Sequence, residues 1–225
     1  MEIILNNVSK NFGASTVLDD ISMRLISGRV YGFQGINGSG KTMLMRAISG
    51  LVHPSSGQIV IDGQPLRGEN GFPKNMGLMI ETPSFLVNHS GFSNLRMLTG
   101  LSEHSASDEE LWHTLEKLGL GEMGNKKVKK YSLGMKQRLG IACAIMEKPE
   151  LLILDEPFNS LDEEGIDTLC RIIGENKARG ALIIIACHDY ELLSAVSDEI
   201  FKLVAGKVTL HMCKDDAGIF HEAEI

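Results

Sequence analysis

The stretch "GINGSGKT", Gly35–Thr42, fits the pattern G-x-x-x-x-G-K-[ST] between an apolar run and a helical pattern. Glycines without a Cβ let backbone N–H groups converge on phosphate oxygens, and a helix N-terminus adds the positive end of its dipole. We expect Lys41 to neutralise the β- and γ-phosphates of a nucleotide as a catalytic residue, and Thr42 to give its hydroxyl to Mg²⁺. A glycine-rich turn beside a solvent-exposed lysine is the alternative. The residues predicted to bind the nucleotide are Gly35, Asn37, Gly38, Ser39, Gly40, Lys41 and Thr42.

Three short apolar runs, at 30–33, 151–154 and 182–187, lack the alternation of half-buried strands. Such runs are typical of parallel strands buried on both faces. Apolar residues at helical spacing follow the first and second runs. The alternation of strand and helix predicts an α/β fold with a mainly parallel, doubly wound sheet and with functional sites at the carboxyl ends of its strands.

Two regions depart from this alternation. The patterns at residues 1–28 and 57–66 predict antiparallel strands, and the second of these segments contains an Asp-Gly turn signal. These strands would form a small β layer that flanks the core. From Phe85 to Glu147 the pattern is helical, with Ser107 or Asp108 as the cap of its clearest helix. We interpret this region as a helical lobe inserted into the core.

The segment "LLILDEP", Leu151–Pro157, delivers two carboxylates where an apolar strand ends. Together with the phosphate loop, this arrangement predicts that Asp155 holds Mg²⁺ and that Glu156 acts as the general base on an attacking water. A pair of acids after a strand is also a common helix N-cap. The pair gains its weight from the phosphate loop in the same chain.

Composition limits the other classes of function. The net charge is −7 and the one basic cluster is Asn125–Tyr131, so we expect no nucleic-acid partner. The longest apolar run, Ala181–Cys187, is far shorter than the roughly 20 residues that cross a bilayer. The first residues lack the pattern of a signal peptide, which favours the cytoplasm.

Cysteine and histidine spacing gives no sign of a structural metal. The four cysteines are widely spaced, without a CxxC pair, and three of them lie in apolar segments. We therefore expect reduced, buried thiols in place of disulfides or zinc ligands. Apart from His188, the histidines show no ligand spacing.

The ordered set of motifs resembles the ATP-binding cassette (ABC) ATPases over nearly the whole chain. The resemblance implies a P-loop NTPase core with an inserted helical subdomain. It implies that residues 1–225 form a single ABC ATPase domain. Within this domain, residues 1–82 and 148–225 would form a RecA-like core plus the antiparallel β layer, and residues 83–147 would form a helical subdomain. The five markers after the phosphate loop are "MIETP" at the Q-loop position, "YSLGMKQRLG" as the signature motif, "LLILDEP", "NSLD" as the D-loop, and His188 after the third core strand.

The signature motif implies a second phosphate cradle. Ser132 and Gly134 stand just ahead of a helix expected from Met135 to Ile145, and helix starts bind anions. The resemblance implies that two cassettes meet head to tail, so that Ser132 and Gly134 touch the γ-phosphate held by the partner's Lys41. A capped helix without this role is the alternative.

Three further residues receive roles from the resemblance. His188 is expected to contact the γ-phosphate as a catalytic residue, against the alternative of an ordinary strand-end histidine. Asp162 is expected to bridge to the facing cassette, although an N-cap of the helix near Glu163 explains it equally well. Phe12 matches the aromatic that stacks on adenine, with simple packing as the alternative.

The Q-loop position carries Glu81 where the family has glutamine. This acid, together with the SLGM-type signature, resembles the subgroup of exporters that give resistance to bacitracin and lantibiotic peptides. Glu81 is expected to be a metal ligand that links the nucleotide to the segment from Pro83 to Leu95. Phe85, Leu86 and Phe92 are expected to contact a permease from there.

The resemblance implies an ATP-hydrolysing subunit that powers export, of an antimicrobial peptide or a similar amphipathic substrate, through a separate membrane permease. Its cofactors would be ATP and Mg²⁺. Its partners would be the permease and a second cassette, identical or different, on the inner face of the cell membrane. The alternative is a soluble ABC-type ATPase in a process such as translation or DNA repair.

Overall fold

The computed structural model describes residues 1–66, 71–81, 83–101 and 105–224. Its larger sheet has the strand order β11-β10-β9-β3-β8-β7-β6, with five parallel strands from β9 to β6 and an antiparallel edge formed by β10 and β11. The predicted α/β fold and its three buried strands are confirmed. The strands are β3 (Val30–Gln34), β6 (Met76–Met79), β7 (Leu151–Asp155), β8 (Leu182–Cys187), β9 (Glu199–Val204), β10 (Lys207–Lys214) and β11 (Phe220–Ala223).

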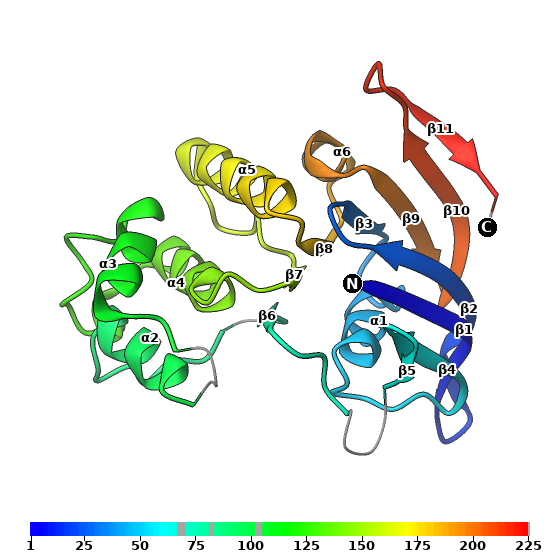
Figure 1. Cartoon of the computed structure of the whole chain (residues 1–225), viewed down its shortest axis with the longest axis horizontal. Coiled ribbons are helices and arrows are strands. Elements are labelled where there is room, and N and C mark those ends of the chain that lie inside the picture. Colours follow the sequence, from blue (N-terminus) through cyan, green and yellow to red (C-terminus); the bar gives the residue numbers. More distant parts are fainter. Residues whose placement is uncertain (67–70, 82, 102–104, 225) are drawn as a thin grey trace.

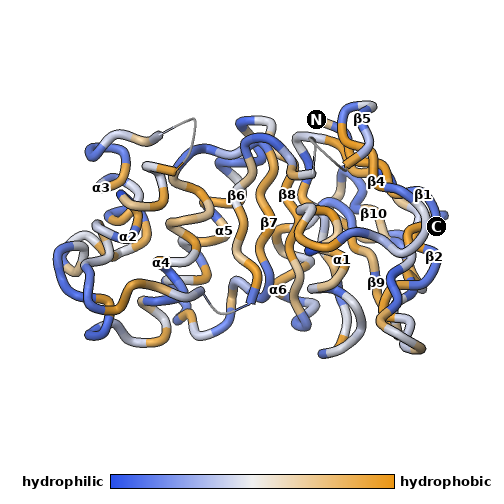
Figure 2. The backbone as a smooth tube through the Cα atoms, turned by 90° about the horizontal axis from the view of Figure 1, so that it is seen from below, coloured by the Kyte–Doolittle hydropathy of each residue, from blue (hydrophilic) through white to orange (hydrophobic). Residues whose placement is uncertain are grey.

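The central strands lack polar alternation because both of their faces are buried. On β7, Leu151 and Ile153 belong to one hydrophobic core, and Leu152 and Leu154 belong to the other. Successive side chains of a strand point to opposite faces, so a strand between two cores needs apolar residues at every position. Figure 2 shows β7 and β8 as nearly continuous apolar tubes through the middle of the molecule.

A second sheet, antiparallel and in the order β2-β1-β4-β5, is the predicted flanking layer. Its apolar side chains share one core with α1 (Lys41–Ile48) and with one face of the larger sheet. The Asp-Gly turn joins β4 and β5. The strands of this layer are β1 (Glu2–Phe12), β2 (Ser15–Ile26), β4 (Ser56–Ile61) and β5 (Gln64–Pro65).

Helices cover the other face of the larger sheet. Ser107, one of the two predicted caps, accepts a hydrogen bond from the Glu110 backbone N–H, and the Glu110 side chain completes a capping box. Figure 1 shows α2, α3 and α4 gathered at one end of the molecule, although the predicted subdomain boundaries stay a prediction. The helices are α2 (Gly91–Thr99), α3 (Asp108–Lys117), α4 (Leu133–Ile145), α5 (Glu163–Ala178) and α6 (Tyr190–Val196), with a 3₁₀ turn at Val128–Lys130.

Strand register brings three loops together at the carboxyl ends of the parallel strands. Gln34 of β3 is paired with Cys187 of β8, and Asp155 of β7 is paired with Ala186 of β8. The segments that follow β3, β7 and β8 therefore leave the sheet side by side, and these segments carry the predicted catalytic side chains. Among the helices of the described residues, none combines the length and apolar content needed to cross a membrane.

Candidate functional site

The loop between β3 and α1 has the backbone that a phosphate cradle requires. Gly38 and Gly40 have φ of 81° and 109°, a region that other residues avoid. At Gly35 a Cβ would lie 2.4 Å from Ser39 Oγ and 2.6 Å from the Leu203 carbonyl, so only glycine fits. Gly40 caps α1 without a side-chain hydrogen bond, which leaves the first N–H groups of the helix available to an anion.

Lys41 turns back into this loop. Its Nζ donates to the Gly35 carbonyl at 2.7 Å and lies 3.6 Å from Glu156 Oε1. The side chain is only 5% exposed, so its charge depends on these few oxygens for compensation. The ammonium is thus held at the centre of the loop, where a phosphate would replace the carbonyl as its partner.

Thr42 and Asp155 join the loop to the end of β7. The Thr42 hydroxyl donates to Asp155 Oδ2 at 2.7 Å. Burial raises the pKa of the Asp155 carboxyl, the Thr42 hydrogen bond opposes that rise, and the charge of Glu156 adds to it. A buried carboxylate that faces a hydroxyl offers two hard oxygen ligands, so these residues fit Mg²⁺.

Glu156 adopts a φ of 48°, a left-handed conformation that is uncommon for glutamate. Its backbone N–H donates to the Ala186 carbonyl at 2.8 Å, and its Oε2 lies 2.8 Å from Nδ1 of His188. Its Oε1 is buried without a hydrogen-bond partner in the described residues. Oε1 therefore has the ion pair with Lys41 but no hydrogen bond, while Oε2 contacts His188.

Cys187 completes a small group with these two residues. Ligand atoms of Glu156, Cys187 and His188 all lie within 4.8 Å of one another. Burial raises the pKa of the Cys187 thiol to about 11, so the thiol is neutral at physiological pH. Sequence reasoning treated Cys187 only as a buried thiol.

Glu81 has a partner that sequence reasoning missed. Its Oε1 lies 2.7 Å from Arg46 Nη2, and Arg46 stands four residues after Thr42 on α1. The i, i+4 spacing from Thr42, the predicted metal ligand, is the signal that could have found this arginine. An ion pair this exposed adds little stability, so its effect is on the position and charge of Glu81. Whether Glu81 is a metal ligand stays a prediction.

The signature motif forms the N-terminus of α4, with one correction. The helix begins at Leu133, two residues before the expected Met135, because the Ser132 side chain caps it by accepting from the Met135 N–H. Gly134 therefore lies in the first helical turn, where a Cβ would be 2.6 Å from the Ser160 carbonyl. The close approach joins the signature helix to the segment after Glu156.

Asp162 is the N-cap of α5, as one of its two interpretations predicted. Its Oδ1 accepts from the Gly165 N–H at 3.0 Å and pairs with Arg138 of α4. These bonds lower the pKa of its carboxyl. Contact with a facing cassette remains a prediction for this residue. Gln137 of α4, another residue missed from sequence, donates to the carbonyls of Glu156 and Pro157 at 3.1 Å each.

The phosphate loop, the carboxylates after β7 and the pair of Arg46 and Glu81 line a cleft of ≈ 610 Å³. Six predicted site residues are not among its lining residues: Phe12, Gly35, Ser132, Gly134, Asp162 and His188. The Phe12 ring is 53% exposed at the end of β1, with Lys10 Nζ 5.0 Å from its centroid, so it remains open to a stacking partner. The lining residues are Val17, Asn37, Gly38, Ser39, Gly40, Lys41, Thr42, Met43, Arg46, Glu81, Leu133, Gln137, Asp155, Glu156, Asn159 and Ser160.

Comparisons with known proteins agree with this geometry. Residues 18–159 match the family model described as ABC transporter. The chain is 43% identical to YybJ, an uncharacterised ABC transporter ATP-binding protein of Bacillus subtilis, over 90% of this chain and 92% of that protein. It is 36% identical to the lantibiotic transport ATP-binding protein SrtF of Streptococcus pyogenes, over 92% and 88%.

A third relative and a solved structure extend the likeness. The bacitracin transport ATP-binding protein BcrA of Bacillus licheniformis is 37% identical over 97% of this chain, which spans 66% of that protein. The structure of an ATP-binding subunit of an ABC transporter superposes with a TM-score of 0.85 at 28% identity, over 96% of this chain and 91% of the other.

Proposed function

The chain belongs to the ABC transporter family as an ATP-binding subunit with ATPase activity, and we propose that it powers export of an antimicrobial peptide through a separate membrane permease. The observation that carries the ATPase chemistry is the group formed by Lys41, Glu156 and His188 at the edge of the phosphate loop. The relatives named for lantibiotic and bacitracin transport support the class of substrate.

The proposed roles follow from the contacts. The loop N–H groups and Lys41 bind the β- and γ-phosphates, and Lys41 exchanges the Gly35 carbonyl for a phosphate oxygen. When Lys41 turns to the phosphate, Oε1 of Glu156, which has no hydrogen-bond partner within the described residues, takes the proton of the attacking water, while His188 contacts Oε2. Mg²⁺, held by Thr42 and Asp155, would neutralise charge that develops on the phosphates.

The second phosphate cradle supports a head-to-tail dimer. Ser132 caps α4 and is exposed, as is Leu133, the first residue of the helix. The start of α4 is therefore accessible to a phosphate held by a second chain. We propose that Ser132, Gly134 and Asp162 of one subunit complete the site of the other. Phe12 would stack on the adenine.

The permease would dock on the segment that starts at Pro83. Leu86 and Val87 are 54% and 47% exposed there. Phe92 instead stacks on Trp112, with ring centroids 4.7 Å apart, and is therefore engaged within the subunit. This location would keep the subunit in the cytoplasm, peripheral on the inner face of the cell membrane, with Leu86 as the main apolar anchor.

The test begins with the chemistry. Glu156→Gln removes the proton acceptor but keeps the shape, so we expect ATP turnover to fall on the order of 100-fold or more while ATP binding persists. Size-exclusion chromatography with Mg-ATP is expected to show an ATP-bound dimer. Turnover at the wild-type rate would contradict the assigned base.

Coupling to a permease is tested by purification from detergent-solubilised membranes. We expect a multi-span protein to accompany the chain, and Leu86→Asp to abolish this while ATP turnover persists. Leu51, 51% exposed near α1, provides the matched control Leu51→Asp, which keeps the partner. Loss of peptide resistance in cells with Leu86→Asp is the expected phenotype. Association with ribosomes or DNA instead would favour the soluble alternative.

A further inference from the structure

A second group of potential metal ligands lies on β9 and β10, outside the nucleotide cleft. Ligand atoms of Glu199, His211 and Cys213 all lie within 4.8 Å of one another. None of the three residues lines the cleft. We propose that this group binds a borderline-soft divalent cation, with Zn²⁺ as the natural occupant, through one oxygen, one nitrogen and one sulfur.

Strand geometry explains why these residues meet. His211 and Cys213 are two residues apart on β10, so their side chains point to the same face of the sheet. Cys213 is paired with Glu199 across the antiparallel ladder, which places Glu199 on that face as well. Sequence reasoning missed the group because it tested cysteine pairs and histidine spacings separately and did not combine His211 with Cys213. The Glu199 to Cys213 contact also depends on the ladder register.

The distances suit a metal ion. His211 Nε2 lies 2.9 Å from Glu199 Oε2 and 3.4 Å from Cys213 Sγ. Zinc bonds of about 2.0–2.3 Å at tetrahedral angles place neighbouring ligand atoms about 3.3–3.6 Å apart. The three atoms therefore reach coordination geometry through small side-chain rotations, without movement of the strands.

His211 is oriented as a metal ligand would be. Its Nδ1 donates to the Glu224 carbonyl at 2.9 Å, because a carbonyl can only accept. Its ring stacks on Phe201 with centroids 4.2 Å apart and an interplanar angle of 8°. These contacts leave Nε2 directed at the carboxylate, where a cation, either a proton or a metal ion, must lie between the two.

The burial of Glu199 and His211 also favours binding. The Glu199 and His211 side chains are 11% and 14% exposed, so the ligands have already lost most of their water. Arg29 pairs with Oε1 of Glu199 and leaves Oε2 for the site. Zn²⁺ would displace the thiol proton into solvent, and three protein ligands leave one position for water.

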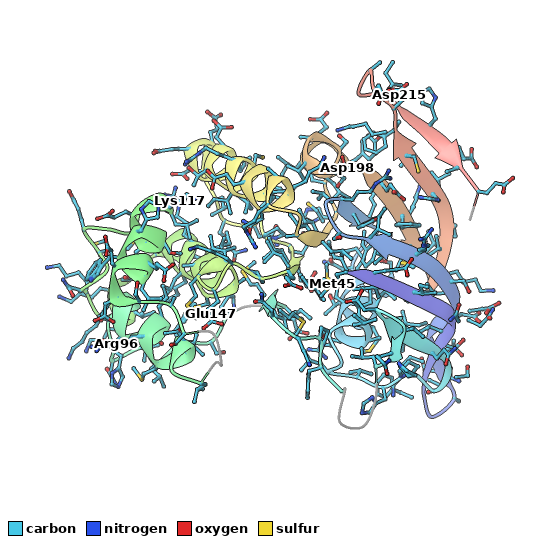
Figure 3. All side chains as sticks on the ribbon, viewed as in Figure 1. Met45, Arg96, Lys117, Glu147, Asp198 and Asp215 are labelled. Carbon is cyan, nitrogen blue, oxygen red and sulfur yellow. The ribbon has the colours of Figure 1, made fainter. Side chains whose placement is uncertain are left out.

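A metal ion at this site would stabilise the antiparallel edge of the larger sheet, formed by β10 and β11. Figure 3 labels Asp198, which precedes Glu199, and Asp215, which lies at the turn between β10 and β11. A metal ion between β9 and β10 would hold this turn-bearing hairpin to the parallel strands. The expected consequence is a more stable edge, with little effect on ATP turnover.

Cobalt titration of the full chain tests the proposal. Metal-free, reduced protein is titrated with Co²⁺, whose thiolate complex absorbs in the near ultraviolet, and Zn²⁺ is then added as competitor. We expect one equivalent to bind, Zn²⁺ to displace it, and the Tm to rise with Zn²⁺. Cys213→Ser and His211→Gln are each expected to weaken binding at least about tenfold, as the loss of a ligand exceeds the loss of an outer partner.

Other thiols provide the controls. Cys170→Ser, on α5, is expected to keep full cobalt binding. Cys187→Ser tests the group beside Glu156, and we expect it to keep the signal also. A signal lost in Cys187→Ser but kept in Cys213→Ser overturns the proposal. The absence of both cobalt and zinc binding also overturns the proposal and would make His211 and Glu199 a simple ion pair. The folding of Cys213→Ser is checked by circular dichroism.

Discussion

At the scale of single residues, the site combines strain with unsatisfied polar atoms. Glu156 keeps a left-handed backbone that costs on the order of 1–3 kcal/mol, and its buried Oε1 lacks a hydrogen-bond partner within the described residues. Ser39 Oγ, in the phosphate loop, is also buried without a partner there. Both costs occur where a phosphate, a metal ion and a water would supply the missing contacts, which supports the assignment of the site.

Arg46 and Glu81 yield a prediction about the metal. Glu81→Gln removes negative charge near Asp155, so we expect the Mg²⁺ concentration for half-maximal ATPase activity to rise several-fold. Arg46→Gln leaves Glu81 uncompensated, so that concentration is expected to fall. The measurement is ATP turnover against Mg²⁺ at fixed ATP. Arg24→Gln, which breaks the exposed ion pair with Glu2, is the control and is expected to leave the Mg²⁺ concentration for half-maximal activity unchanged. Equal Mg²⁺ dependence in all variants would reduce Glu81 to a subgroup marker.

Asp155 yields a prediction about pH. Burial raises the pKa of its carboxyl above the ordinary 3.8, so the folded chain binds that proton more tightly than the unfolded chain. This stabilisation is complete below 3.8 and is lost as the pH rises through the raised pKa. Asp155→Asn is therefore expected to raise the Tm of the nucleotide-free protein by a few degrees at pH 8, and by less near pH 4. A lower Tm at both pH values would contradict this account.

At the scale of elements, helix caps explain what sequence could and could not predict. The cap of α3 was narrowed to Ser107 or Asp108, and the three-residue spacing from Ser107 to Glu110 is the signal of the capping box that favours Ser107. The start of α4 was misplaced by two residues because Ser132 and Gly134 were both placed ahead of the helix, although the Ser132 hydroxyl accepts from the Met135 N–H and so begins the helix at Leu133. One side chain then serves as both cap and proposed ligand.

This double role predicts a difference between two serines. Ser107→Ala and Ser132→Ala each remove an N-cap and are expected to cost about 1 kcal/mol in urea denaturation. Only Ser132→Ala is expected to lower ATP turnover as well, since Ser132 is proposed to contact the γ-phosphate of the facing site. Equal turnover in both variants would leave Ser132 as a cap alone.

At the scale of the whole molecule, each subunit is expected to carry half of two sites. Lys41→Ala disables the phosphate loop and Gly134→Asp disables the signature helix, so either variant alone is expected to be inactive. In a mixture of both, half of the dimers contain one intact composite site, and turnover should recover to about a quarter of wild type. Each variant is first checked for folding by circular dichroism. No recovery would mean that the sites are not shared between chains.

The sequence by itself determined the fold class, the phosphate loop, the carboxylates after β7 and the family. These features are local: glycines at fixed spacing, apolar runs at every position of a buried strand, and polar residues where the strand ends. They are readable because neighbouring residues in the chain create them.

Only the tertiary structure decided which distant side chains meet. Arg46 of α1 reaches Glu81 because it lines one pocket with Leu78 and Ile80, just before Glu81 in the chain. His188 reaches Glu156 because β7 and β8 are in register. The group on β9 and β10 depends in the same way on ladder pairing, which a shift of one residue would abolish by turning Cys213 to the opposite face. Register and packing are properties of the whole fold, and no short stretch of sequence specifies them.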